Sequence, residues 1–212
     1  MRFIPIALTV TLLLGSPIVH ADLYEDMVQA VKKNDASGVT ELLGRGLDVN
    51  TVDPSGNTLL MLAIRESNEK AVATLLAAKP RLETSNALGE TALMLACIKG
   101  NAVMVRALLQ AGASVNSAQG WSPLMYAAYQ GNAEVVKALL AKGASIDAIN
   151  HNGTTALMLA ARQGHVEVID ALLNAGADLQ AVNKLNESAL DFARRHQREE
   201  IIERLKRAGA ID

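Results

Sequence analysis

The sequence has few of the residues from which chemical sites are built. Its only cysteine, Cys97, cannot form an internal disulfide, and none of its four histidines has metal-ligand spacing to a cysteine or a carboxylate. It contains no Gly-x-Ser-x-Gly, phosphate-binding loop or dinucleotide fingerprint. No nucleophile–base pair or carboxylate pair stands out. We therefore expect no catalytic, cofactor-binding or metal-binding residues, and a protein that is not an enzyme.

Aromatic side chains and excess positive charge are also scarce. Aromatic residues make up 3% of the chain, and 20 Lys and Arg stand against 22 Asp and Glu, a formal net charge of -2. A nucleic-acid partner would require a basic face, so we expect none. Half of the 212 residues are apolar, mostly small or aliphatic, which favours short stacked helices over a β-sandwich.

Only the N-terminus carries a long apolar run. Phe3–Leu14 follows a positive Met1-Arg2, and small residues at Val19 and Ala21 precede Asp22. This is the layout of a cleavable signal peptide over residues 1–21. A membrane anchor is the alternative, but the run is shorter than the roughly 20 apolar residues that span a bilayer. We expect the mature chain to be periplasmic, or alternatively secreted, without membrane insertion.

One segment recurs along the chain. It stands at Gly56–Ala63, Gly89–Ala96, Gly120–Ala127 and Gly153–Ala160, with a weaker copy at Asn186–Ala193; the four glycines are 33, 31 and 33 residues apart. A hydroxyl in each strong copy can cap a first helix: Thr58, Thr91, Ser122 and Thr155. Pro123 fits the first helical turn. Glycines then permit left-handed turns after the first helix (100, 131, 164) and after the second helix (112, 143, 176).

These residues resemble the ankyrin repeat, with its Gly-x-Thr-Pro-Leu-His-x-Ala, Gly-His or Gly-Asn, Val-x-x-Leu-Leu and Gly-Ala pattern. The resemblance covers almost all of residues 22–212, and with the signal peptide it indicates an exported, periplasmic bacterial type. It implies an all-α solenoid of stacked helix-turn-helix units with short β-hairpin-like fingers. The units are a capping unit at 22–52, four repeats at 53–85, 86–116, 117–149 and 150–182, and a capping unit at 183–212.

Departures from the pattern predict local differences. The first unit lacks the Thr-x-Leu motif, and its expected helices are Tyr24–Lys33 and Ser37–Arg45. Ser67 and Lys79 stand where glycines are expected, so we expect the unit at 53–85 to be irregular. The 31-residue spacing places a two-residue deletion between Asn116 and Gly120, within a finger.

Sulfur-containing and histidine side chains are interpreted as packing residues. Met61, Met94, Met125 and Met158 replace the histidine of the motif and should form a column. Aligned thioethers could bind Cu(I) or a haem iron. Neighbouring units are about 10 Å apart, too far for two sulfurs to share a metal, so we favour packing. Cys97 is expected to be buried, and His165 to pack locally.

The family resemblance places partner binding on the concave surface, at finger tips and the exposed side of first helices. The side chains that the resemblance exposes on this surface also include Asn57, Thr154 and Leu185. Three of the five aromatics after residue 21 belong to one unit, which favours a hot spot centred on Trp121 and Tyr129. The alternative is that Trp121 lies against its finger. Alanine at Trp121 is expected to weaken binding with little change in stability. The candidate partner-binding residues are Leu88, Ile98, Lys99, Trp121, Tyr129, His151 and Arg162.

The function expected from these features is that of a monomeric, exported interaction module that binds a periplasmic or envelope protein. By resemblance, the role could be that of an accessory factor to a stress-defence enzyme such as catalase. The alternatives are an immunity protein that neutralises a toxin in the periplasm, and a metal or haem chaperone that uses the methionines. Fold alone does not decide between these roles.

Overall fold

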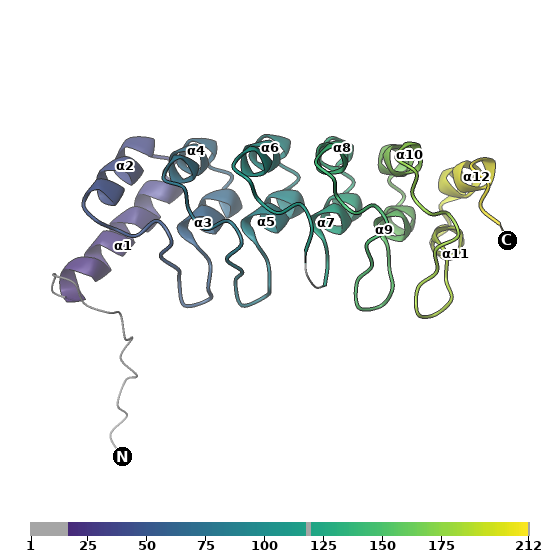
Figure 1. Cartoon of the computed structure of the whole chain (residues 1–212), viewed down its shortest axis with the longest axis horizontal. Coiled ribbons are helices and arrows are strands. Elements are labelled where there is room, and N and C mark those ends of the chain that lie inside the picture. Colours follow the sequence, from purple (N-terminus) through teal and green to yellow (C-terminus); the bar gives the residue numbers. More distant parts are fainter. Residues whose placement is uncertain (1–16, 118–119, 212) are drawn as a thin grey trace, which may run out of the picture.

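The computed structural model describes the backbone of residues 17–117 and 120–211, and side chains from Asp22 onward. Within these residues the chain forms helices and one isolated antiparallel bridge, between Val52 and Thr58. The helices form pairs that stack along one axis, as Figure 1 shows. They are α1 (Pro17–Lys32), α2 (Ala36–Gly44), α3 (Leu59–Arg65), α4 (Glu69–Ala77), α5 (Ala92–Lys99), α6 (Ala102–Gln110), α7 (Pro123–Gln130), α8 (Ala133–Ala141), α9 (Ala156–Gln163), α10 (Val166–Asn174), α11 (Ala189–Arg195) and α12 (Glu199–Arg207). The predicted all-α solenoid is confirmed.

Hydroxyl caps begin the odd-numbered helices from α3 onward. In each case the side-chain oxygen of the N-cap accepts a hydrogen bond from the backbone N–H three residues on, which satisfies an otherwise unpaired donor. The four predicted caps are confirmed: Thr58, Thr91, Ser122 and Thr155. Ser188 caps α11 in the same way. Pro123 is the first residue of α7, as expected.

The unit at 53–85 keeps the backbone of its neighbours, so the expected irregularity is wrong. Ser67 and Lys79 adopt φ values of 57° and 52°, the left-handed conformation that Gly100 and Gly112 adopt in the next unit. The two side chains are exposed, so a Cβ at either position meets no packed neighbour. The strain of a left-handed non-glycine residue, about 1 kcal/mol, is small beside the stacking of the unit.

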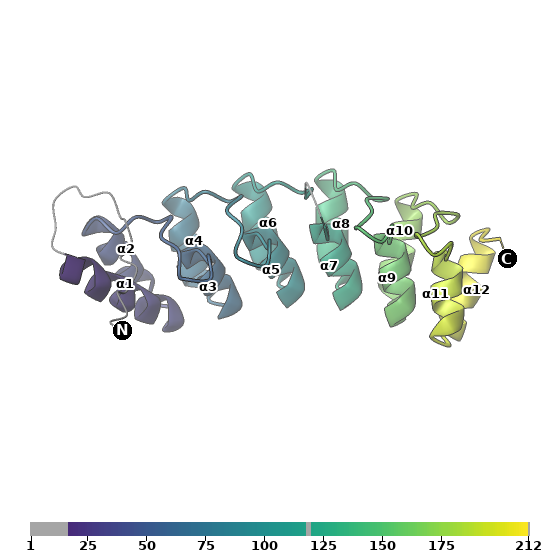
Figure 2. The same cartoon turned by 90° about the horizontal axis from the view of Figure 1, so that it is seen from below.

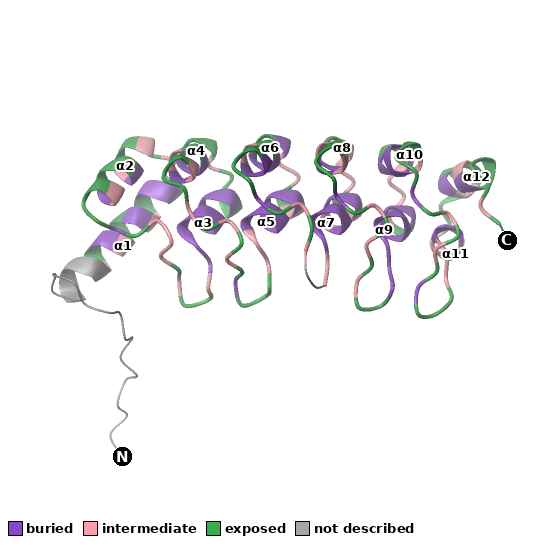
Figure 3. Cartoon of the chain, in the orientation of Figure 1, coloured by how far each residue is buried: buried purple, intermediate pink, exposed green. Residues whose placement is uncertain are grey.

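The core is a continuous apolar layer between the two rows of helices. Figure 3 shows buried residues concentrated where the rows face each other. The methionine column lies inside it: Met61, Met94, Met125 and Met158 are 0%, 5%, 1% and 1% exposed. The sulfur atoms of Met61 and Met158 also accept the N-cap N–H of their own helices, at 3.5 Å. These contacts support the packing interpretation. Cys97 is fully buried, and burial raises the pKa of its thiol.

Polar ladders connect consecutive units on the side where the second helices end. A side-chain oxygen of one unit accepts the backbone N–H of the next at 2.7–2.9 Å, and the acceptors are Asn50, Glu83, Asn116 and Asp147. At the turn between paired helices, a second set of side chains donates hydrogen bonds to backbone carbonyls of the preceding unit. Its donors include Asn68, Asn132 and Arg198, and His165 contacts the Tyr129 carbonyl at 3.0 Å in the same way.

The first unit differs from the prediction in where its first helix begins. α1 begins at Pro17 rather than Tyr24, and so includes residues of the predicted signal peptide. Proline's fixed φ suits the first helical position. Most of the predicted signal peptide, residues 1–16, lies outside the described residues. α2 ends at Gly44, one residue before the predicted end.

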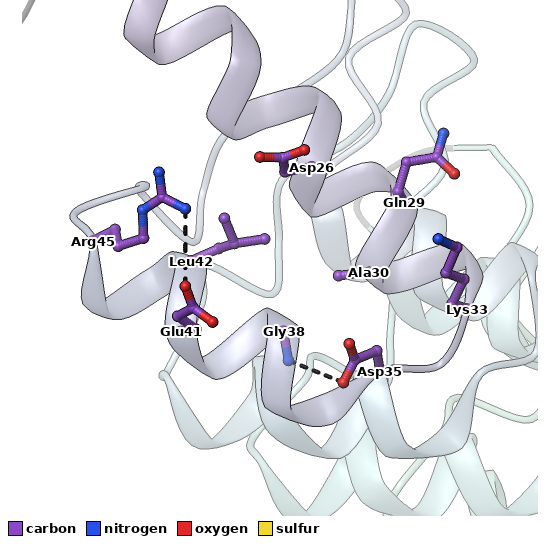
Figure 4. A pocket seen from close by; sticks show the side chains of 9 residues that line it. All are labelled: Asp26, Gln29, Ala30, Lys33, Asp35, Gly38, Glu41, Leu42 and Arg45. Carbon is purple, nitrogen blue, oxygen red and sulfur yellow. Dashed lines mark hydrogen bonds and ion pairs between the residues drawn. The ribbon is translucent and has the colours of Figure 1, made fainter.

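Both ends of the stack are polar. A pocket of about 280 Å³ lies between α1 and α2. Figure 4 shows the side chains that line it, most of them polar or charged, including Asp26, Lys33 and Arg45. At the other end, Arg204 of α12 bonds both carboxylate oxygens of Asp170 at 2.6 Å and also pairs with Glu200. No helix in the described part of the chain combines the length and apolarity that crossing a membrane requires.

Candidate protein-binding surface

The fingers and the first helices of the pairs share one face of the stack, which we call the finger face. Figure 1 shows the fingers projecting beyond the row α3, α5, α7, α9 and α11, and Figure 2 views the stack from the finger side. A backbone bond closes four of the fingers like a small hairpin, with the donors Asp53, Asn86, Asn150 and Asn183; the Asn86 N–H, for example, donates to the Glu90 carbonyl at 3.0 Å. The Ala87 N–H donates to the Ser55 carbonyl at 2.9 Å and so joins two neighbouring fingers. These four fingers are therefore an ordered part of the surface.

Two residues expected to be exposed on this face are buried at the finger bases. Asn57 is 4% exposed because its amide donates to Asp53 and accepts from the Asn86 amide. Thr154 is 7% exposed, and its N–H donates to the Asn150 side chain inside the finger. Burial opposes ionisation of Asp53, but the Asn57 bonds prevail and lower the pKa of this carboxyl. Asn57 and Thr154 stabilise fingers and are unsuited to partner contact.

The structure brings the three aromatic residues of the fourth unit together. The Trp121 ring lies 5.1 Å from that of Tyr126, tilted by 41°, and 5.5 Å from that of Tyr129, edge to face. All three side chains are half-buried against the core. Burial, and next the nearby Glu90 carboxylate, raise the pKa of Tyr126. The cluster is a preformed aromatic surface, held in place by its own ring contacts.

The other candidate residues on the first helices lie beside this cluster and differ in how far their side chains are buried. Ile98, Tyr129 and Arg162 occupy the same position on the successive helices α5, α7 and α9; Ile98 is half-buried and Arg162 is exposed. Lys99 follows Ile98 and is exposed. The structure thus places these side chains in one row that runs across the middle of the finger face.

Two candidates lie on fingers instead of helices. Leu88, at the tip of its finger, is 81% exposed. His151 is exposed, and its Nε2 lies 3.9 Å from where a Cβ on Gly120 would stand. Leu185 is 75% exposed at the equivalent tip of the last unit, as the family resemblance indicated for this position, although it is not one of the seven candidate residues.

No metal site is apparent in the described part of the chain, where no three His, Cys, Asp or Glu side chains gather closely enough to hold an ion. His165 packs at the start of α10, with its ring over Gly131. It therefore makes the local packing contact expected of it.

The sequence matches the family described as Ankyrin repeats (3 copies) over residues 27–119, 79–150 and 124–211. The chain belongs to the ankyrin-repeat family. Ankyrin-repeat domains are typically non-catalytic modules for protein–protein interaction, so the family implies a protein partner. A comparison with curated protein sequences gives no match.

Two solved structures show how this ankyrin-repeat chain compares with others. The human ASB11 ankyrin repeat domain is 25% identical, with a TM-score of 0.81 over 93% of this chain and 85% of that one. The second is the complex of the Bd0816 predatory endopeptidase from Bdellovibrio bacteriovorus with immunity protein Bd3460. Its matching chain is 34% identical, with a TM-score of 0.78 over 86% of this chain and 97% of that one.

Proposed function

We propose that this chain is an exported, non-enzymatic module that holds one folded protein against its finger face. The aromatic cluster carries the proposal: Trp121, Tyr126 and Tyr129 form a rigid half-buried surface beside the protruding Leu88. Tyrosine and tryptophan are enriched among residues that dominate binding energy, because they bury large rigid areas at low entropic cost. Membership of the ankyrin-repeat family supports a protein as the ligand.

We further propose that the partner is an exported hydrolytic enzyme that the chain keeps inactive. The observation that favours this immunity role is the similarity to a chain in a complex of an endopeptidase with an immunity protein, which covers 97% of that chain. An accessory factor for a stress-defence enzyme such as catalase would use the same surface. The two roles differ in their effect on the partner, because an immunity protein lowers its activity and an accessory factor sustains it.

Export is compatible with the fold of the first unit. Cleavage after Ala21 would leave 22–32 of α1, including Leu23 and Met27, which are 6% and 0% exposed in the core. The side chains that attach α1 to the stack therefore remain in the mature chain. N-terminal sequencing of protein from a periplasmic fraction should begin at Asp22; an N-terminus at Met1, or recovery only from the cytoplasm, would contradict export.

The chain is proposed to act as a monomer because its first and last units both expose charged side chains. The outer surface of the first unit carries Asp26, Lys33 and Arg45, and α12 exposes Glu203 and Lys206. Covering these charges with a second copy would remove them from water without apolar gain.

Partner capture tests the surface with a matched pair of variants. Tagged protein is recovered from its own cell envelope, and co-purifying proteins are quantified. Leu88→Ser/Arg162→Ala changes two exposed side chains of the finger face, whereas Val103→Ser/Lys137→Ala makes the same kinds of change on α6 and α8. One protein should be enriched by wild type and the control, and reduced about tenfold or more with the finger-face variant. Equal recovery by both variants would remove the finger face as the binding site.

The activity of the captured partner then separates the proposed roles. Adding stoichiometric purified chain should inhibit the partner if the chain is an immunity protein. Undiminished or increased activity would contradict that role and favour the accessory-factor role. A metal or haem chaperone would instead carry metal after purification, which elemental analysis would detect; the burial of the four methionines argues against accessible thioether ligands.

A further inference from the structure

We propose that the segment of the partner that enters the finger face is acidic, with a large apolar side chain flanked by carboxylates. This inference rests on the proposed function and states the chemistry of the partner at that same surface. It follows from how the chain uses its own charges on the finger face.

The carboxylates of the finger face are largely occupied by the chain itself. Asp53 accepts the N–H groups of Ser55 and Asn57 at 2.8 Å. Glu90 accepts a hydrogen bond from the Asn86 amide at 3.0 Å. Glu187 bonds Asn183 at 2.9 Å and also pairs with Arg195. These bonds fix the three carboxylates within the fingers. The donors to Asp53 and Glu90 are neutral amides, so these two side chains keep their negative charge, and of the three only Glu187 is paired with a cation.

Three cations of the same face are not used in this way, unlike Arg195, which pairs with Glu187. Lys99, Arg162 and Lys184 are exposed, and among the described residues none of them has a carboxylate within ion-pair distance. Lys99 lies on α5, to one side of the aromatic cluster, and Arg162 and Lys184 belong to the two units on its other side. Two carboxylates toward the first unit are exposed: Glu66, at the end of α3 and one unit before Lys99, and Glu25 on α1.

These three cations are a local feature of a chain whose formal net charge is -2. On the second helices some charges are paired with each other, Arg106 with Glu134 and Arg204 with Asp170, and others, such as Lys70 and Lys137, are exposed without an ion pair among the described residues. The finger face therefore presents unpaired cations on both sides of the apolar surface formed by Leu88, Ile98 and the aromatic cluster. A complementary ligand places an apolar side chain in the middle and carboxylates toward both ends.

Aromatic rings between cations also suit single-stranded nucleic acid, on whose bases such rings stack. The net negative charge of the chain and its ankyrin-repeat fold favour the acidic protein segment. The two ligands are separated directly by experiment.

Selection from a random 12-residue peptide library displayed on phage tests the proposal with the full chain as bait. Enriched peptides should carry Trp, Phe, Leu or Met with Asp or Glu on both sides. Their affinity, measured by fluorescence anisotropy, should fall about tenfold or more for Lys99→Glu/Arg162→Glu. It should also weaken as NaCl rises from about 50 to about 500 mM, because exposed charges are screened.

The matched control is Lys70→Glu/Lys137→Glu, which reverses two exposed charges on α4 and α8 and should bind the peptides like wild type. Four results would overturn the proposal: no enriched peptides, enriched peptides without acidic residues, equal loss in both charge-reversal variants, or tighter binding of an oligothymidine probe than of the peptides. Partner capture by the finger face, combined with any of these results, would leave the proposed function standing and remove only the acidic segment.

Discussion

At the scale of single residues, one backbone conformation recurs in different surroundings. Gly131 and Gly143 both adopt left-handed φ values, of 79° and 84°. A Cβ on Gly131 would stand 2.5 Å from Nδ1 of His165, whereas a Cβ on Gly143 would meet nothing within 4 Å. The first glycine is required both for its backbone and for the space it leaves, and the second only for its backbone.

Alanine substitution separates these two requirements. Gly143→Ala should lower the free energy of unfolding by about 1 kcal/mol, the cost of a left-handed non-glycine residue. Gly131→Ala should cost about 2–3 kcal/mol, because the His165 ring must also move away from the Tyr129 carbonyl. Urea denaturation measures both. Equal losses would show that the contact between His165 and the glycine contributes nothing.

Trp121 shows where residue-level prediction from sequence stops. The repeat pattern places it one residue before the Ser122 cap, which identifies the position but not the direction of its ring. The structure turns the ring onto Tyr126 and Tyr129, side chains from the first and second turns of α7. These contacts favour a larger loss of stability in Trp121→Ala than the small change expected from the sequence.

Trp121→Ala is therefore expected to lower stability by about 1–3 kcal/mol, through lost burial and two lost ring contacts. Thermal unfolding followed by circular dichroism measures the change, with Leu88→Ala as the control because that side chain is 81% exposed. An unchanged midpoint for Trp121→Ala would restore the original expectation and make this variant a clean binding probe.

At the scale of elements, the second helices of the pairs differ in how they begin. Asn101 and Asn132 cap α6 and α8 by accepting a backbone N–H at 3.0 Å. Asn132 also donates to the Gly100 carbonyl at 2.5 Å. His165, at the same position before α10, makes no side-chain cap and only contacts the Tyr129 carbonyl. The pattern accepts histidine or asparagine there, but the two residues satisfy different numbers of backbone groups.

A reciprocal exchange tests this difference. His165→Asn should raise the free energy of unfolding by about 0.5–1 kcal/mol by adding a cap to α10, and Asn132→His should lower it by a similar amount. Chemical denaturation of both variants supplies the measurement. Loss of stability in His165→Asn would mean that the ring packing over Gly131 outweighs the missing cap.

The elements were largely predictable because caps and left-handed turns are encoded locally. Hydroxyls, Pro123 and the turn glycines place helix ends to within a residue or two. Ser67 and Lys79 misled the prediction because a backbone conformation can persist after its preferred residue is lost, when the site is exposed and flanking turns hold it. On the finger face, sequence identified exposed positions such as Leu88 and Arg162, but Asn57 and Thr154 are buried by contacts within or between fingers that no local pattern reveals.

At the scale of the whole molecule, each unit is supported by its neighbours. α12 packs mainly on α10 and α11, and its Ile201 and Leu205 are 1% and 0% exposed. In such a linear stack, stability is approximately a sum of unit terms and nearest-neighbour interfaces. Damage at one end is therefore expected to remain near that end.

Leu205→Ala tests this locality, because it removes core volume at a cost of about 2–4 kcal/mol. Amide hydrogen exchange should accelerate in α11 and α12 while α5 and α6 keep their wild-type protection. Leu139→Ala in α8 is the internal comparison, since that fully buried leucine has units on both sides and should affect exchange more widely. Uniform acceleration by Leu205→Ala would show that the chain unfolds as one cooperative body.

The polar ladders between units have a consequence for how such a chain can change over generations. Each rung joins a side chain of one unit to a backbone group of its neighbour, as from Asn50 to the Arg81 N–H or from Asn132 to the Gly100 carbonyl. Every unit offers those backbone groups unless a proline occupies the donor position. A unit can thus be duplicated, deleted or exchanged without a matching mutation next door. The length of the array, and with it the reach of the finger face along a partner, is free to vary by whole units while the joints remain intact.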